Sequence, residues 1–361
     1  MSRNNHILAL DGLRTFAVAS VLITHYADGT SFLRHLGIDW AIVGVHIFFV
    51  LSGFLITKLL IEKYFHSDVF ISGFAAFLAA RVARILPLAF LAVGFIALFS
   101  PVSGQFLAYN LTFTSNFYTA RTGEWFPYAG HYWSLSVEMQ FYLLFPVFLW
   151  VFRKRLLAFM IVALIIALLS RYALSHISDY KNPSLLLPAR VDAFLWGGLL
   201  FCASGSLSFR RISQVLFWLG AVVYFGQSVL LGLAHISTMP DMSLGNVCFT
   251  GLVGLTMCKG SLFARIFSNK TLVHFGKISY GIYIWHPIMW LARSTINDAT
   301  GGILYISHVP IWTVLAVLTI FFAEISWVAV ERPINTRGHQ LAAHLLKMGT
   351  RRKSSSEAAA T

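Results

Sequence analysis

Two ionisable side chains lie inside the first apolar stretch of the chain. Arg14 and His25 belong to the run LALDGLRTFAVASVLITHY, and at 3.6 residues per turn their spacing places both on nearly the same helical face. A guanidinium and an imidazole are costly in a lipid-spanning helix, so such groups usually face a bundle interior or an aqueous cavity where they bind or react. The competing interpretation is that Arg14 reaches a headgroup and His25 caps the helix at the interface. We favour a functional role for the pair.

Two more titratable side chains are expected at a depth similar to that of His25. Glu138 lies in HYWSLSVEMQFYLLFP, and His286 stands directly before the final proline of the run SYGIYIWHP. A carboxylate beside a histidine orients the ring and stabilises its protonated form, which is the arrangement of a general base that takes a proton from a hydroxyl. Glu138 is equally consistent with a structural pair inside the bundle.

A second candidate site is expected at the cytoplasmic level. Arg81 and Arg84 in RVARILPLAF are one turn apart at the predicted start of a span, and together they form a forked anion site suited to phosphate. An ordinary positive flank is the alternative. Ser52 and Gly53 form a small pair in mid-membrane that permits a kink or close helix approach. We take these four residues as candidates for donor binding.

The outer side carries the candidates for holding an acceptor. Arg190 and Asp192 stand in LLLPARVDAFLWGG at the expected outer entry to a span, where they either hold a polar acceptor or form a local ion pair. Trp133 and His286 complete this acceptor-side set. No metal site and no prosthetic group are predicted, because the three cysteines lack metal-type spacing and fall in spanning segments.

The composition requires a membrane setting for these residues. Hydrophobic residues make up 57% of the chain and charged residues 11%, which no ordinary water-soluble domain shows. Because a span needs roughly 20 apolar residues, we predict an all-α integral membrane protein, a bundle of about ten transmembrane helices. The predicted spans are 7–26, 40–62, 83–100, 133–152, 155–174, 190–204, 212–232, 244–260, 275–297 and 309–331.

The basic residues set the expected orientation. Most Lys and Arg residues fall on one side of the predicted spans, which indicates that both termini are cytoplasmic. The net charge of +13 is then a topology signal and an attraction to anionic lipid, and not a sign of nucleic-acid binding. We expect one transmembrane domain over 1–337 and a short cytoplasmic tail over 338–361, in which one short amphipathic helix precedes a polar, disordered end. Glu324 is the expected neutralising partner of Arg14. A signal peptide is not expected.

The chain resembles the membrane acyltransferase type three family, whose members O-acylate bacterial surface glycans and related substrates. The resemblance rests on six runs in order: LDGLRTFAVASVLITHY, GVHIFFVLSGFLIT, RVARILPLAF, HYWSLSVEMQFYLLFP, PARVDAFLWGG and SYGIYIWHP. It implies ten core helices in the bacterial inner membrane, cytoplasmic acyl-CoA as donor (acetyl-CoA by default) and an acceptor hydroxyl on the outer side. Some relatives carry a fused extracytoplasmic esterase-like domain, which we do not expect in this chain.

Residue by residue, the resemblance implies catalytic roles for Arg14, His25 and Glu138, and a donor role for Arg81 and Arg84. The expected activity is O-acetyl transfer to a glycan such as O-antigen, exopolysaccharide or lipo-oligosaccharide. Both direct transfer and a covalent acyl-His25 relay stay open. The alternative is a proton-coupled transporter or flippase of a glycan or small solute, in which the same polar residues form a relay.

Overall fold

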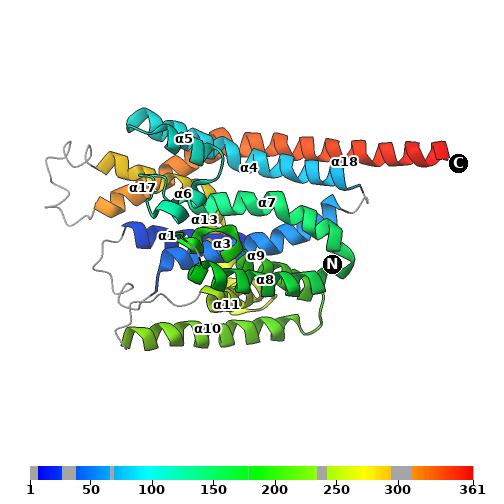
Figure 1. Cartoon of the computed structure of the whole chain (residues 1–361), viewed down its shortest axis with the longest axis horizontal. Helices are drawn as coiled ribbons and strands as arrows, with labels where there is room; N and C mark the ends of the chain where they lie inside the picture. Colours follow the sequence, from blue (N-terminus) through cyan, green and yellow to red (C-terminus); the bar gives the residue numbers. More distant parts are fainter. Residues whose placement is uncertain are drawn as a thin grey trace. The chain divides into compact units, whose positions relative to one another are not determined.

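The protein is built from helices throughout the part that can be described. The computed structural model describes residues 7–26, 38–65, 69–177, 179–233, 242–293 and 311–360, and within these ranges it contains helices and no strand (Figure 1). The helices are α1 (Leu8–Tyr26), α3 (Trp40–Leu59), α4 (Phe70–Phe99), α5 (Gly104–Leu111), α6 (Ser115–Thr122), α7 (Tyr132–Phe152), α8 (Leu156–Ile177), α9 (Val191–Ala203), α10 (Phe209–Leu233), α11 (Met242–Met257), α12 (Leu262–Phe267), α13 (Lys270–Lys277), α14 (Ser279–Trp285), α17 (Ile311–Ser326) and α18 (Arg332–Ala360).

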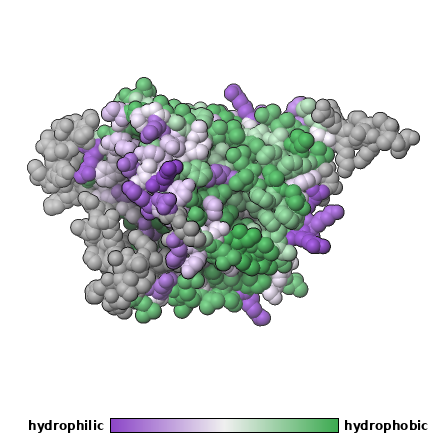
Figure 2. Space-filling view, viewed as in Figure 1, coloured by the Kyte–Doolittle hydropathy of each residue, from purple (hydrophilic) through white to green (hydrophobic). Residues whose placement is uncertain are grey.

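Five helical stretches among the described residues are long and apolar enough to cross a membrane. The face seen in Figure 2 accordingly carries broad apolar areas, and large side chains of α7 and α8 such as Leu144 and Ile166 are exposed. A helical membrane protein is therefore confirmed, whereas the number of about ten spans stays a prediction. The five stretches are Leu8–Tyr26, Trp40–Tyr64, Phe70–Phe99, Tyr132–Leu174 and Ile311–Thr350, and the shorter apolar helices are Val191–Ala203 and Met242–Met257.

The chain divides into two compact units, which we describe one at a time. The first unit comprises Met1–Phe54 and Asp192–Ala323, and the second comprises Leu55–Val191 and Glu324–Thr361. Each unit therefore combines segments that are far apart in the sequence. Parts of two predicted spans, residues 294–297 and 309–310, lie outside the described residues.

Close backbone contacts fix α1 in the first unit. A Cβ atom added at Gly12 would lie 1.9 Å from the carbonyl oxygen of Phe267, and one at Gly276 would lie 1.8 Å from the carbonyl oxygen of Asp11. The hydroxyl of Thr15 donates to the carbonyl of Leu272 at 2.5 Å. Small residues allow this approach, so α12 and α13 hold the first half of α1 in place.

The predicted span 275–297 is not one helix. The structure has two short helices, α13 and α14, followed by a 3-10 turn at Ile288–Leu291. Pro287 stands directly before that turn, and because proline lacks an N–H it cannot continue the α-helical hydrogen bonding. The break leaves His286 at the end of α14.

The helix around the arginine pair in the second unit begins earlier than predicted. The span was expected at 83–100, but α4 runs from Phe70 to Phe99. The residues before Arg81 are apolar and rich in alanine, which favours helix. Arg81 and Arg84 therefore lie well inside the helix, and the expectation that they mark its start is wrong.

The chain end contains a longer helix than the short one expected in the tail 338–361. A π-helical turn at Trp327–Glu331 leads into the helix α18, which runs to Ala360. Pro333 follows this π-helical turn directly, inside the continuous helical stretch Ile311–Thr350, and the irregular hydrogen bonding of the turn accommodates a residue without an N–H. Figure 1 shows α18 beside α4, and Gly338 lies against Ala83. Contact with α4 extends at least to Gly349, which lies against Ser72, and supports a helix longer than the short amphipathic one expected from the sequence.

Replacement of Gly53 by alanine should destabilise the protein. In the first unit, a Cβ atom at this position would lie 2.0 Å from the carbonyl oxygen of Phe194, which forces α3 and α9 apart. We expect a clear fall in the thermal unfolding midpoint of the detergent-purified chain. Gly94→Ala is the matched control, because its Cβ would meet nothing within 4 Å and alanine is the better helix former. Equal midpoints for the two variants would contradict this packing role.

Candidate functional site

The imidazole of His25 is held by its own helix at the last turn of α1. Its Nδ1 atom lies 3.0 Å from the carbonyl oxygen of Val21. Because a carbonyl only accepts, Nδ1 must carry the proton, and in the neutral ring Nε2 carries the lone pair. The His25 side chain is exposed. The local geometry therefore presents a proton acceptor at Nε2.

His286 lies next to His25 in the first unit. The two ring centroids are 5.1 Å apart with the planes tilted by 42°. His286 is fully buried, and its Nδ1 donates to the carbonyl of Tyr283 at 2.7 Å. The structure thus brings together two residues that the sequence placed at one depth from spans far apart in the chain.

Tyr26 ties the end of α1 to this second histidine. Its hydroxyl donates to the main-chain carbonyl of His286 at 2.5 Å and lies 2.7 Å from the hydroxyl of Thr319. All three residues are buried. Sequence reasoning missed Tyr26 and Thr319, since a tyrosine at the end of a span is usually an interfacial anchor. Its position directly after His25 was the one available signal.

A carboxylate that the sequence analysis did not select lies within electrostatic range of His25. Asp39 precedes α3, and its side chain accepts hydrogen bonds from the backbone N–H groups of Ala41 and Ile42. Its negative charge acts on the ring of His25. Asp39 therefore caps α3 and supplies a negative charge in the surroundings of that imidazole.

Arg14 has an acidic partner on its own helix. Its guanidinium lies 2.6 Å from the carboxylate of Asp11, one turn earlier. Asp11 is buried and Arg14 is half-buried. The neutralising partner expected from the sequence was Glu324, which belongs to the other unit. That pairing stays a prediction, and the observed ion pair is Asp11 with Arg14.

A buried polar chain joins three helices of the first unit. His46 Nδ1 lies 2.7 Å from the side-chain oxygen of Asn246, whose amide nitrogen donates to Asp192 at 3.0 Å. The three residues are at most 1% exposed. Asp192, predicted on the acceptor side, is thus part of an interior network that links α3, α9 and α11.

The arginine pair of the second unit lies in a polar cluster. Arg81 is only 8% exposed, and the charges of Arg84 and Glu138 both act on it. Tyr142 donates a short hydrogen bond to Glu138. The phenol of Tyr64 also interacts electrostatically with the guanidinium of Arg81. A buried guanidinium needs such compensation. Glu138 therefore lies in the cluster of Arg81, and its predicted relation to His25 in the other unit stays a prediction.

The same cluster receives side chains from the chain end. Glu331 in the π-helical turn accepts from Ser326 at 3.3 Å and is within range of the charge of Arg84. On α18, the charges of Arg81 and Lys63 act on His339. Cations outnumber carboxylates among these groups, so the cluster can hold a further anion.

Trp133 and Arg190, two acceptor-side candidates, are in contact in the second unit. The Arg190 guanidinium lies 5.3 Å from the centre of the Trp133 ring and donates to the carbonyl of Ser184 at 2.6 Å. Arg171 donates to the carbonyl of Ala189, one residue before Arg190. Trp133 and Arg190 belong to the second unit, and His286 and Asp192 belong to the first. That the four residues form one acceptor-side set stays a prediction.

Of the predicted donor-binding residues on α3, Gly53 has a structural explanation. It touches the backbone of α9 at Phe194, which accounts for a glycine at this position without a ligand. Its neighbour Ser52 is half-buried. A donor-binding role for the two residues stays a prediction.

Comparisons with known proteins identify relatives over nearly the whole chain. A family model described as an acyltransferase domain matches residues 7–328. The chain is 27% identical over 381 residues to the O-acetyltransferase OatA of Staphylococcus aureus, which covers 95% of this chain and 59% of that protein. It is 28% identical over 372 residues to the putative peptidoglycan O-acetyltransferase YrhL of Bacillus subtilis, covering 93% and 56%. The peptidoglycan O-acetyltransferase OatA of Listeria monocytogenes is likewise 28% identical over 372 residues, covering 92% and 56%.

The chain therefore spans under three fifths of the length of these curated relatives. No solved structure matches it.

Removal of the Tyr26 hydroxyl should loosen the end of α1. Tyr26→Phe leaves the carbonyl of His286 without this donor in a buried setting, which costs about 1–3 kcal/mol of stability. A lower thermal unfolding midpoint of the purified chain is the expected result. Tyr180→Phe, at an exposed tyrosine, is the control and should leave the midpoint unchanged. If both variants unfold like the wild type, Tyr26 does not position His286.

Proposed function

Since the chain belongs to the acyltransferase family whose model matches residues 7–328, we propose that it is a membrane O-acetyltransferase. It transfers an acetyl group from acetyl-CoA to a hydroxyl of a cell-surface glycan, from the cytoplasmic membrane of a bacterium. The names of the Bacillus and Listeria relatives favour peptidoglycan as the acceptor over the O-antigen, exopolysaccharide and lipo-oligosaccharide expected from the sequence.

The observation that carries this proposal is the hydrogen bond from His25 to Val21. This hydrogen bond fixes the imidazole in the form that carries its lone pair on Nε2. The side chain is exposed, and the chain belongs to an acyltransferase family. Nε2 takes the proton of the acceptor hydroxyl while the oxygen of that hydroxyl attacks the thioester carbonyl of acetyl-CoA. The carbon–sulfur bond then breaks, and the CoA thiolate leaves and recovers the proton from the imidazolium.

Neighbouring groups support the charge that this step creates. The carboxylate of Asp39 acts on the ring of His25 and stabilises the imidazolium. Tyr26 holds the backbone of His286 beside that ring. Positioned groups of this kind lower the barrier by reducing the reorganisation that the transition state requires.

The polar cluster around Arg81 and Arg84, called the arginine cluster below, is the proposed site for the phosphates of acetyl-CoA. Arg81 and Arg84 supply two guanidinium groups one turn apart, and Lys63 and His339 add basic groups in the same unit. Phosphate is the anion that best matches paired guanidinium forks. In this proposal Glu138 and Tyr142 orient Arg81, with which they share the cluster.

Replacement of His25 by asparagine should abolish most of the transfer. Loss of a general base lowers the rate by about 10²- to 10⁴-fold, measured as ester groups on isolated surface glycans by mass spectrometry in a deletion strain that expresses the variant. His176→Asn is a matched control, because its Nδ1 makes the same bond to a carbonyl four residues earlier, at 2.8 Å, on an exposed part of α8. Wild-type ester levels with folded His25→Asn protein would refute the catalytic role.

The same strains separate the enzyme from the transporter. If glycan esters are unchanged in the deletion strain while a glycan or solute accumulates inside the cells, the transport alternative replaces the enzyme.

Neutralisation of Arg81 and Arg84 should weaken donor binding more than turnover. We expect Arg84→Gln and the double variant Arg81→Gln/Arg84→Gln to raise the KM for acetyl-CoA by about tenfold or more, because each charge-assisted contact contributes about 1.5–3 kcal/mol. Membranes containing the full chain and a soluble glycan acceptor provide the assay. Arg155→Gln removes an exposed arginine from the turn between α7 and α8 and is the charge control. An unchanged KM in the folded double variant would exclude the phosphate role.

A further inference from the structure

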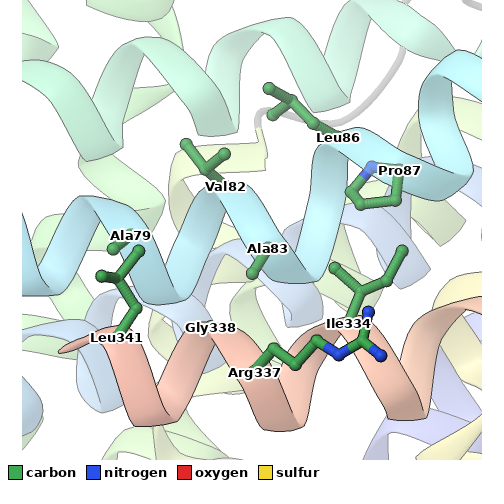
Figure 3. A pocket seen from close by; sticks show the side chains of 9 residues that line it. All are labelled: Ala79, Val82, Ala83, Leu86, Pro87, Ile334, Arg337, Gly338 and Leu341. Atoms are coloured by element: carbon green, nitrogen blue, oxygen red, sulfur yellow. The ribbon is translucent and has the colours of Figure 1, made fainter. Parts of the chain in front are cut away.

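A groove between α4 and α18 in the second unit is not used by the proposed reaction. It has a volume of about 470 Å³ and is open on one side, within the range of small-molecule binding sites. Figure 3 shows the side chains of both helices that line it. The lining residues are Ala79, Val82, Ala83, Leu86, Pro87, Ile334, Arg337, Gly338 and Leu341.

The groove lies on a different face of α4 from the arginine cluster. Its α4 residues recur at the i, i+3, i+4, i+7 spacing of a single helical face. At 100° per residue, Arg81 projects about 160° away from the centre of that face. The groove is therefore separate from the proposed phosphate site, even though both use α4.

Close packing of small residues forms the floor of the groove. Gly338 approaches α4 so closely that an added Cβ would lie 2.2 Å from that of Ala83. The walls are larger apolar side chains that remain accessible, with Val82 at 41% and Leu341 at 51% exposure. An open apolar groove on a membrane protein matches the shape and polarity of a lipid acyl chain.

One charged side chain stands among the nine that line the groove. Arg337 is exposed, and its side chain extends along the groove beside Ile334 in Figure 3. The lining includes no acidic residue. A ligand with both an apolar chain and a negative group would satisfy the two features together.

The predicted topology places these residues near anionic lipid. With both termini cytoplasmic, α18 follows the last predicted span on the inner side, and the positive-inside bias of the sequence supports that orientation. The cytoplasmic leaflet is where anionic phospholipids attract basic side chains.

We infer that the groove between α4 and α18 binds an anionic phospholipid of the inner leaflet. Its phosphate contacts Arg337, and one acyl chain lies along the apolar walls formed by Val82, Leu86 and Leu341. The inference does not depend on the acyl-transfer proposal. It predicts a lipid selectivity that the rest of the apolar surface does not share.

The test is titration of the detergent-purified full chain with phosphatidylglycerol and with phosphatidylcholine of identical acyl chains. Lipid binding is followed by native mass spectrometry and by the thermal unfolding midpoint. We expect the wild type to bind phosphatidylglycerol about fivefold more tightly, since a basic residue near the membrane contributes about 1 kcal/mol toward anionic lipid. Arg337→Gln should bind the two lipids equally, and Arg337→Lys should keep the preference.

Two further variants locate the site. Arg332→Gln removes another exposed arginine from the same helix, outside the groove, and should keep the wild-type preference. Ala79→Leu fills the groove and should weaken binding of both lipids. The inference is overturned if the wild type does not discriminate between the lipids, if Arg337→Gln keeps the preference, or if Arg332→Gln loses it as fully. If folded Ala79→Leu binds like the wild type, the lipid lies elsewhere; if it does not fold, the two arginine variants decide.

Discussion

A charged side chain inside an apolar bundle requires a nearby group that compensates it, and this requirement organises both units of the protein. Asp11 accompanies Arg14, and Glu138 with Tyr142 accompanies Arg81. In water these contacts would add little, but the low dielectric of the bundle makes an uncompensated charge very costly. The polar residues therefore come in local groups, and each group fixes the relative positions of the turns or helices that carry it.

Close helix approach makes these polar groups possible. Close backbone contacts occur at Gly12, Gly53 and Gly276. They fix how far each helix is shifted along its axis relative to its neighbour. Without a hydrophobic driving force between helices in lipid, such packing is a main source of stability. The short bonds from Tyr26 to His286 and from His46 to Asn246 need this fixed register, because a hydrogen bond weakens steeply with small displacements.

The sequence predicted the class of fold well, since hydropathy over long apolar runs reports directly on the membrane. It also placed His25 and His286 at one depth, because depth follows from the position of a residue along a helix of known direction. It missed that α4 begins at Phe70, although the alanine-rich residues before Arg81 favour helix. It did not predict the full length of α18, which packs against α4, a segment far away in the sequence. The hydrogen bond from Tyr26 to His286 could not be predicted from the sequence, because 260 residues separate the two partners.

The functional residues show the same contrast. The bond from His25 to Val21 spans one helical turn, so its existence depends only on the rotamer of one side chain. The association of Glu138 with Arg81 depends on how α7 packs against α4, and depth along a helix does not report on lateral neighbours. Sequence reasoning therefore selected candidate residues more readily than it predicted their neighbours in the structure.

The ion pair between Asp11 and Arg14 has a consequence for the biogenesis of the protein. An arginine inside a hydrophobic segment opposes the entry of that segment into the bilayer, by up to about 2.5–3.5 kcal/mol at the helix centre. Its partner is only one turn away on the same helix, so the pair can form as soon as this segment becomes helical, before any later helix has been synthesised. This segment thus brings its own counter-charge to the translocon, and its insertion need not wait for the helices that follow it.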